Sequence, residues 1–179
     1  MLTTEKTVLI IVDVQGKLAQ VIHQREFLFE NLKKLIKGIR VLKIPILWLE
    51  QNPSGLGPTT AEIAELMSGV TPISKMTFNA CATAEFMAAL TATNRKQILI
   101  AGIEAHICVY QTALDLLKRS YAVQVVADAV SSRTLQNKEI ALMKMRDAGV
   151  GMTSVEMALF ELLKVAEGQS FKEIAKIVK

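Results

Sequence analysis

Short apolar runs, each long enough for one buried strand, alternate along the chain with longer stretches of helical periodicity. The first run is β-branched and wholly apolar, as expected of a strand whose two faces are both covered. The predicted strands are Thr7–Val12, Ile46–Leu49, Thr71–Ser74, Gln97–Ala101, Ala122–Ala127 and Val150–Ser154. Apolar residues spaced three and four apart predict helices between them. These helices are Phe27–Lys43, Thr60–Met67, Ala82–Ala92, a helix from near His106 to about Ser120, Gln136–Ala148 and two more that close the chain.

The alternation of strands and helices predicts one α/β domain over residues 1–179, with three layers and a doubly wound, mostly parallel six-stranded sheet. Two serine or threonine and glutamate pairs, Thr59 with Glu62 and Ser170 with Glu173, have the spacing of helix capping boxes. The turn-rich stretch 50–63 is expected to cross the carboxyl edge of the sheet. If the fourth strand lies beside the first, a ligand-binding crevice opens between them.

Composition favours a soluble protein with an aliphatic core, since 51% of the residues are hydrophobic and only 5% are aromatic. No apolar run approaches the roughly 20 residues that span a bilayer. The N-terminal residues lack the layout of a signal peptide, and two cysteines do not make a disulfide framework. We therefore expect a cytoplasmic protein that makes no membrane contact.

The net charge of +4, from 21 Lys and Arg against 17 Asp and Glu, raises the question of nucleic-acid binding. The cations are scattered, however, and they are interleaved with apolar residues, as is typical of the solvent-exposed faces of amphipathic helices. No basic platform with interleaved aromatic residues is present, so no nucleic-acid partner is expected. The loop after the first strand also lacks the GxGxxG pattern, which disfavours a nucleotide-binding domain.

Three side chains that are candidates for catalysis or binding follow predicted strands. Asp13 ends the first strand, where it could meet a ligand or simply serve as a turn or cap residue. Lys75 follows the third strand, and a lysine is by default a solvated surface residue. Cys108 lies in the first turn of a predicted helix, where the helix terminus is expected to lower the thiol pKa and favour a nucleophilic thiolate. A buried cysteine that only packs is the alternative.

The segments around these residues resemble the isochorismatase-like cysteine hydrolase superfamily, which includes nicotinamidases and N-carbamoylsarcosine amidases. The segments are IIVDVQ with Asp13, ISKMTFNA with Lys75, GIEAHICVYQTALD with Cys108, and VVADAV with Asp128. The likeness covers nearly the whole chain. The sequence patterns EQNP…GLG and GIExHxCV are similar to those of the YcaC-like and isochorismatase-domain-containing branch. The resemblance implies the strand order 3-2-1-4-5-6.

The resemblance also implies a catalytic triad of Asp13, Lys75 and Cys108. Asp13 would accept the thiol proton and return it to the leaving group, while Lys75 holds Asp13 in place and favours the thiolate. A cis peptide bond is implied at Ile103–Glu104, with the backbone N–H groups of Glu104 and Cys108 as the oxyanion hole. The substrate pocket is expected to be lined by Gln15, Trp48, Gln51, Phe78, Ala105 and His106.

The segment after the second strand departs from the metal-dependent members of the superfamily. Nicotinamidases carry an aspartate and histidines there, where this chain has Leu49-Glu50-Gln51-Asn52-Pro53. The two histidines, His23 and His106, match no metal-ligand spacing. We therefore expect neither a metal nor another cofactor, and His106 is interpreted as a loop or rim residue.

Together, these features predict a metal-independent cysteine hydrolase that cleaves a small amide or related acyl compound through a thioester. The small-molecule substrate itself is not specified by the sequence. A homo-oligomer, dimer or larger, is expected from the aliphatic helices and from the resemblance. The alternative is a homo-oligomeric interaction protein that keeps the fold without useful turnover.

Overall fold

Six parallel strands form one sheet in the order β3-β2-β1-β4-β5-β6, in a computed structural model that describes all residues from Met1 to Lys179. The strands are β1 (Thr7–Val12), β2 (Ile46–Gln51), β3 (Ile73–Lys75), β4 (Gln97–Ile103), β5 (Ala122–Ser131) and β6 (Gly151–Thr153). Every neighbouring pair of strands is parallel. The predicted fold and strand order are confirmed, and the sheet is wholly rather than mostly parallel.

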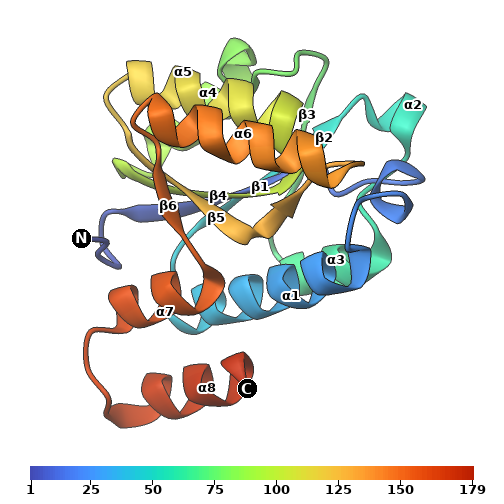
Figure 1. Cartoon of the computed structure of the whole chain (residues 1–179). Helices are drawn as coiled ribbons and strands as arrows, with labels where there is room; N and C mark the ends of the chain where they lie inside the picture. The colour runs from blue at the N-terminus through green and yellow to red at the C-terminus, as the bar shows by residue number, and fades with distance from the viewer.

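Helices cover both faces of this sheet (Figure 1). The α-helices are α1 (Arg25–Val41), α2 (Pro53–Leu56), α3 (Ala61–Ala64), α4 (Ala84–Ala92), α5 (Tyr110–Lys118), α6 (Leu135–Asp147), α7 (Val155–Leu163) and α8 (Gly168–Val178). Helices α4, α5 and α6 lie on one face, α1 and α7 on the other, and α8 packs outside α1. None of the helices combines the length and apolar character needed to cross a bilayer.

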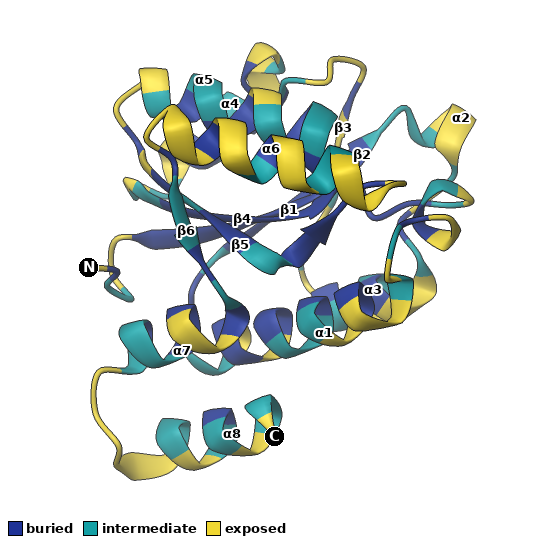
Figure 2. Ribbon diagram, in the orientation of Figure 1, coloured by how far each residue is buried: buried dark blue, intermediate teal, exposed yellow.

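The alternation of side chains along β1 builds a separate core on each face of the sheet. Leu9 and Ile11 pack with α1 and α7, while Val8, Ile10 and Val12 pack with α4 and α5. All of these side chains are fully buried, and the sheet is the darkest layer in Figure 2. This burial on both faces explains why β1 is a continuous apolar run in the sequence.

The carboxyl ends of β1 and β4 lie side by side at the edge of the sheet where the sequence predicted a ligand-binding crevice. Val12 is paired with Leu49 of β2 on one side and with Gly102 of β4 on the other. Gly102 has φ +118, and a Cβ atom there would lie 2.1 Å from the Val12 carbonyl oxygen. Only glycine allows β4 to approach β1 so closely just before the two strands end.

Both predicted capping boxes are wrong. The side chain of Thr59 bonds Glu50 instead of the start of a helix, and Glu62 is paired with Arg25. Helix α8 already begins at Gly168, so Ser170 lies inside it. The residue spacing was correct for a capping box in both cases, but tertiary partners hold Thr59 and Glu62, and Glu173 accepts a hydrogen bond from Gln169 within α8.

Several predicted boundaries also differ from the structure. Thr60–Met67 is divided between α3 and the 3-10 turn η2 (Glu65–Met67), and α4 is preceded by the turn η3 (Ala80–Ala82). The expected loop after β2 contains the single-turn helix α2, and a further turn, η1 (Leu18–Gln20), precedes α1. Strand β5 continues past Asp128 to Ser131 because it pairs with the carboxyl end of β4. The Asp128 carboxylate accepts a hydrogen bond from Val155 N at the start of α7, so it is a structural cap.

Candidate active site

Asp13 and Lys75 form a buried ion pair at the carboxyl edge of the sheet. Lys75 Nζ lies 2.7 Å from Asp13 Oδ2, and the two side chains are 0% and 3% exposed. Asp13 has φ 52, in the left-handed region that residues other than glycine seldom adopt. Such strain is concentrated at functional sites, where the surrounding structure enforces it. Lys75 is therefore not the solvated surface residue that composition alone would suggest.

Lys75 is held by two further acceptors. Its ammonium donates to Gln51 Oε1 at 2.8 Å and to the Thr77 carbonyl oxygen at 3.3 Å. The Gln51 amide in turn donates to the carbonyl oxygen of Met76. All three donors of the ammonium are thereby satisfied, which makes burial of this charge tolerable and fixes its position against Asp13.

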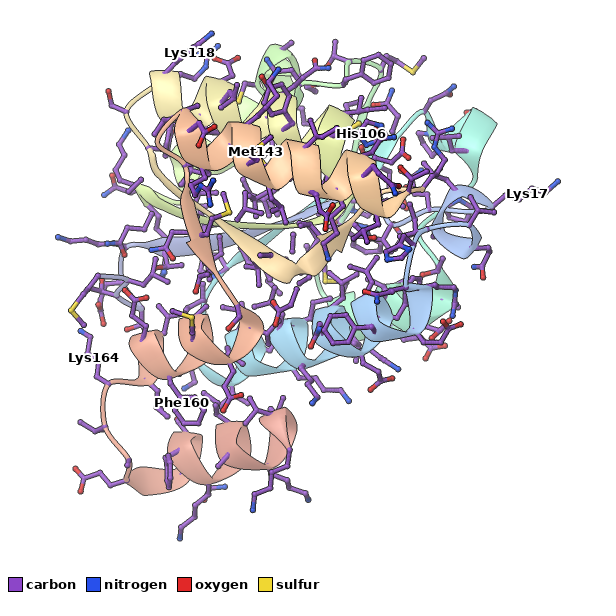
Figure 3. All side chains as sticks on the ribbon, viewed as in Figure 1. Lys17, His106, Lys118, Met143, Phe160 and Lys164 are labelled. Atoms are coloured by element: carbon purple, nitrogen blue, oxygen red, sulfur yellow. The ribbon has the colours of Figure 1, made fainter.

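Cys108 approaches Asp13 from the neighbouring connection, which follows β4. It lies on η4 (Ala105–Val109), a turn of π-helix between β4 and α5. The predicted helix start is therefore confirmed, although its first turn is wider than an α-helical turn. Figure 3 labels His106 on this turn, which lies near the beginning of α6. Single π turns are frequently found at functional sites.

Burial changes the acid–base properties of both Cys108 and Asp13. Burial, and after it the charge of Asp13, raises the pKa of the Cys108 thiol to about 12, although Lys75 opposes this. The prediction of a lowered thiol pKa is therefore wrong. Burial also raises the pKa of Asp13 above the usual aspartate range, against the charge of Lys75. Asp13 Oδ1 is buried and has no protein hydrogen-bond partner. The resting pair is thus a thiol beside an unusually basic carboxylate.

The turn before Cys108 contains a cis peptide bond between Ile103 and Glu104, at the position implied by the resemblance. Two residues of the loop after β5 hold this turn. Arg133 Nε donates to Glu104 Oε1 at 2.7 Å, and Ser132 Oγ lies 2.9 Å from His106 Nδ1. Neither Arg133 nor Ser132 was predicted from the sequence, because their position after a strand is the only local sign of a role.

The pocket residues expected from the sequence are not all brought together. Trp48 packs in the core on the α1 face, opposite to the face of Cys108, and its indole donates to Thr59 Oγ1. This corrects its assignment to the pocket, and the reason is that Leu47 and Leu49 occupy the other face of the strand. Ala105 is fully buried in the core that contains Cys108.

Gln15 has a structural role that the sequence did not reveal. Gln15 is fully buried, and its side-chain amide bonds the backbone of Gln51 and Gly57, so it ties two loops together. Phe78 lies on the loop after β3 and is 55% exposed. Three of the six expected pocket residues have a direct link to the predicted triad. Gln51 bonds Lys75, and Ala105 and His106 lie on η4 together with Cys108.

Glu50 anchors a loop. Its carboxylate accepts hydrogen bonds from the Thr59 backbone N–H at 2.7 Å and from the Thr59 hydroxyl at 2.8 Å. Nowhere in the chain do three or more histidine, cysteine, aspartate or glutamate side chains gather in a group that could hold a metal ion. A prominent hollow of about 550 Å³ lies at the opposite, amino edge of the sheet, lined by residues such as Arg40 and Pro45. The volume of a surface hollow by itself therefore does not identify the candidate site.

The fold and the site together define a class of protein. It is a doubly wound α/β protein with a thiol, a carboxylate and an ammonium group where the strand order reverses. The sequence model of the isochorismatase domain matches residues 7–157, and the chain therefore belongs to the isochorismatase family. It is an isochorismatase-family hydrolase, which confirms the resemblance seen in the sequence.

Three similar proteins illustrate this membership. Isochorismatase domain-containing protein 2 of Danio rerio is 36% identical over 177 residues, covering 99% of this chain and 89% of the relative. The MAR1 ribonuclease structure from Caenorhabditis elegans has a TM-score of 0.93 at 32% identity, covering 99% of this chain and 91% of that chain. YcaC from Escherichia coli, described as an octameric hydrolase of unknown specificity, has a TM-score of 0.93 at 22% identity, covering 98% and 88%, and shows the fold alone.

Proposed function

We propose that this protein is a cysteine-dependent, metal-independent hydrolase that cleaves a small amide or related acyl compound through a thioester. The observation that carries the proposal is the buried contact of 2.7 Å between Lys75 and Asp13, next to the Cys108 thiol. A buried ion pair is costly to build, and replacing it by apolar residues often stabilises a protein. A chemical role for these charges is therefore the simplest reason to keep them beside a thiol.

The proposed reaction begins with proton transfer, because a thiol with a pKa of about 12 is not ionised at neutral pH. As the sulfur attacks the substrate carbonyl carbon, its proton moves to the Asp13 carboxylate. The backbone N–H groups of Glu104 and Cys108 donate to the developing oxyanion. Asp13 then gives its proton to the leaving amine, the C–N bond breaks, and a thioester remains.

Water completes the cycle. It attacks the thioester while Asp13 takes one of its protons, and the acid is released as the sulfur leaves and is reprotonated. The raised pKa of Asp13 suits both halves of this cycle, because a more basic carboxylate accepts a thiol proton more readily and can still return it. Lys75 keeps Asp13 oriented and limits how far burial raises its pKa.

We also propose that the protein is a homo-oligomer that resides in the cytoplasm. The octameric description of YcaC and the half-exposed apolar side chains of Ile140 and Met143 on α6 support association. The two free cysteines support a reducing compartment. Sedimentation at micromolar concentration should show a species larger than the 19.7 kDa chain, and a purely monomeric boundary would contradict the assembly.

A ribonuclease is the second candidate, since the C. elegans relative carries that description. RNA binding relies on cations that neutralise several phosphates. Around the candidate site, Lys75 is buried against Asp13, and Arg133, paired with Glu104 through Nε, is a single partly exposed cation rather than a row of them. The geometry therefore favours a small substrate, and an idle interaction protein is not favoured either.

One screen separates these candidates. Purified protein is incubated with a panel of small amides while ammonia release is followed, and with labelled single-stranded RNA while cleavage is followed. We expect ammonia release that survives treatment with a chelator and disappears in Cys108→Ala. RNA cleavage without amide hydrolysis would overturn the proposal, and activity that is lost on chelation and restored by zinc would overturn its metal independence.

A further inference from the structure

Helix α6 exposes more large apolar side chains than any other helix. Leu135, Ile140 and Met143 are 39%, 49% and 49% exposed, whereas no other helix exposes more than one such side chain. Ala141 and Met145, on the opposite side of α6, pack into the core with residues of α4 and α5. Met143 is labelled on this helix in Figure 3. Single exposed apolar residues are ordinary, but a group of them on one element indicates an interaction surface.

A hollow of about 400 Å³ lies beside this helix at the edge of the sheet. It is lined by four residues of α6 and one each of β5 and β6, namely Glu139, Leu142, Met143, Arg146, Ala127 and Met152. Strand β6 is the last strand of the sheet and pairs only with β5. Proteins commonly cover such edges. The residues that line the hollow, together with Ile140, are called the α6 surface below.

The charges on the α6 surface are opposite in sign and evenly spaced about its apolar centre. Glu139 precedes Leu142 by three residues, and Arg146 follows Met143 by three residues. Glu139 takes part in none of the ion pairs of the chain. Arg146 meets only its neighbour Asp147, at 3.6 Å, and the two side chains are 67% and 66% exposed, so this pair is weak. Both charges are therefore available to a partner.

A second copy of the chain is the partner that fits this arrangement. A twofold axis through the centre of the α6 surface places the two α6 helices antiparallel and brings the same patch of each copy together. Glu139 of each copy then faces Arg146 of the other, while Leu142 and Met143 meet at the axis. Such complementary charges fix the register of an interface. A partner of another sequence would not require charges of opposite sign at equal distances from the apolar centre.

We propose that the α6 surface is a twofold interface between two copies of this chain, with the α6 helices antiparallel and Met143 at the axis. The proposal rests on the proposed homo-oligomer and names the surface and the register through which two copies associate. It does not depend on the proposed hydrolase reaction.

The first experiment exchanges the two charges. Glu139→Arg makes both pairs across the axis repulsive, because each substitution occurs twice in the dimer. We expect the dissociation constant from sedimentation equilibrium to rise about tenfold or more. Arg146→Glu should act in the same way, and the double variant Glu139→Arg, Arg146→Glu should restore the natural constant. Loss of association that the double variant does not restore would overturn the antiparallel register.

The second experiment charges the apolar centre. Met143→Lys places two ammonium groups at the axis and should raise the dissociation constant about 100-fold or more, so that the assembly falls to half its natural mass or less. Met157→Lys on α7 is the matched control, since Met157 is 63% exposed and lies outside the α6 surface, and it should leave the mass unchanged. Thermal melts check folding, and the charge variants test the same surface without altering an apolar side chain.

The third experiment tests the position of the axis by cross-linking. Met143→Cys should give a disulfide-linked dimer when diamide oxidises the two thiols, because residues at a twofold axis lie next to their own copies. Gln136→Cys should not, since the two copies of that residue would lie about 20 Å apart at the rise of an α-helix. The natural protein, whose Cys81 and Cys108 are buried, is the blank.

The outcomes separate this proposal from the others. A natural protein that sediments only as a monomer would overturn the homo-oligomer and this interface together, and the amide screen would still decide the hydrolase. An oligomer that neither Met143→Lys nor the charge variants weaken would overturn this interface alone. Cross-linking through Gln136→Cys but not through Met143→Cys would overturn the assigned axis.

Discussion

Cys81 and Cys108 provide a comparison within one molecule, because both are buried free thiols on short helical turns. Burial raises the pKa of each to about 12. Each thiol is also influenced by a carboxylate and a cation, Asp115 and Arg119 for Cys81, and Asp13 and Lys75 for Cys108. By composition the two surroundings are alike, so the identity of the neighbours does not distinguish them.

The carboxylates differ in basicity. The Asn79 side chain and then Arg119 lower the pKa of Asp115, which lies at the surface. Burial raises the pKa of Asp13 despite Lys75. A carboxylate with a lowered pKa is a poor proton acceptor, whereas one with a raised pKa can take a proton from a thiol and return it. Burial of the base, more than the presence of a base, separates a candidate nucleophile from a packing cysteine.

Removal of the two sulfurs should produce the largest contrast. We expect Cys108→Ala to lower kcat/KM on the best amide from the screen by about 10⁴-fold or more, as for loss of a covalent nucleophile. Cys81→Ala should change it by no more than about twofold, since Cys81 only packs. Steady-state kinetics measures both values, and comparable losses in the two variants would erase the distinction.

The next contrast compares the two carboxylates. Asp13→Asn should lower turnover about 10³-fold, because no group remains to carry the proton from sulfur to the leaving amine. Asp115→Asn removes the carboxylate that influences Cys81 and should leave turnover unchanged. Thermal melts check that both variants fold, and a folded Asp13→Asn protein with turnover within tenfold of the natural one would refute the base assignment.

The cations should differ in their effect on stability. Lys75→Met leaves the Asp13 charge buried without a partner and should lower the free energy of unfolding by about 3 kcal/mol. The Arg119 and Asp115 side chains are 47% and 27% exposed, so Arg119→Met should cause no measurable change. Urea denaturation gives both values. Equal free energies of unfolding for Lys75→Met and Arg119→Met would mean that the ion pair of Lys75 and Asp13 behaves like a solvated pair.

The pH dependence of alkylation should separate the thiols most finely. Cys81 reacts only as its thiolate, so its rate should rise about tenfold per pH unit from pH 7 to 10, below its pKa of about 12. Cys108 can pass its proton to ionised Asp13, so its rate should rise only as pH increases through the raised pKa of Asp13 and then stay level. Iodoacetamide labelling measures both profiles, and parallel slopes would show that Asp13 does not assist.

The predictions from the sequence were most accurate where a signal was local. All six strands were placed, because each is an apolar run ended by turn residues. Asp13 was singled out by its position at a strand end, where parallel sheets bind their ligands, whereas a role for Lys75 came only from the resemblance. The contact between them was a hypothesis from resemblance. The thiol pKa was predicted with the wrong sign because the helix-terminus argument omitted burial.

Non-local packing explains the remaining errors. Trp48 was assigned to the wrong face because the turn-rich loop that follows it does not show which face of the sheet the side chain takes. The pairing of Arg133 with Glu104 joins residues 29 positions apart, and no pattern along the chain connects them. Asp128 was taken as the end of a strand that in fact continues to Ser131.

The sequence by itself determined the order of strands and helices, the apolar faces and the positions of the reactive side chains, because hydrophobic periodicity and turn residues act over a few residues. Tertiary structure alone decided which groups are buried together. Burial sets the basicity of Asp13 and the pKa of Cys108, and it leaves Arg133 exposed beside the buried Glu104. These properties depend on the removal of water by segments distant in the chain, which no local pattern encodes.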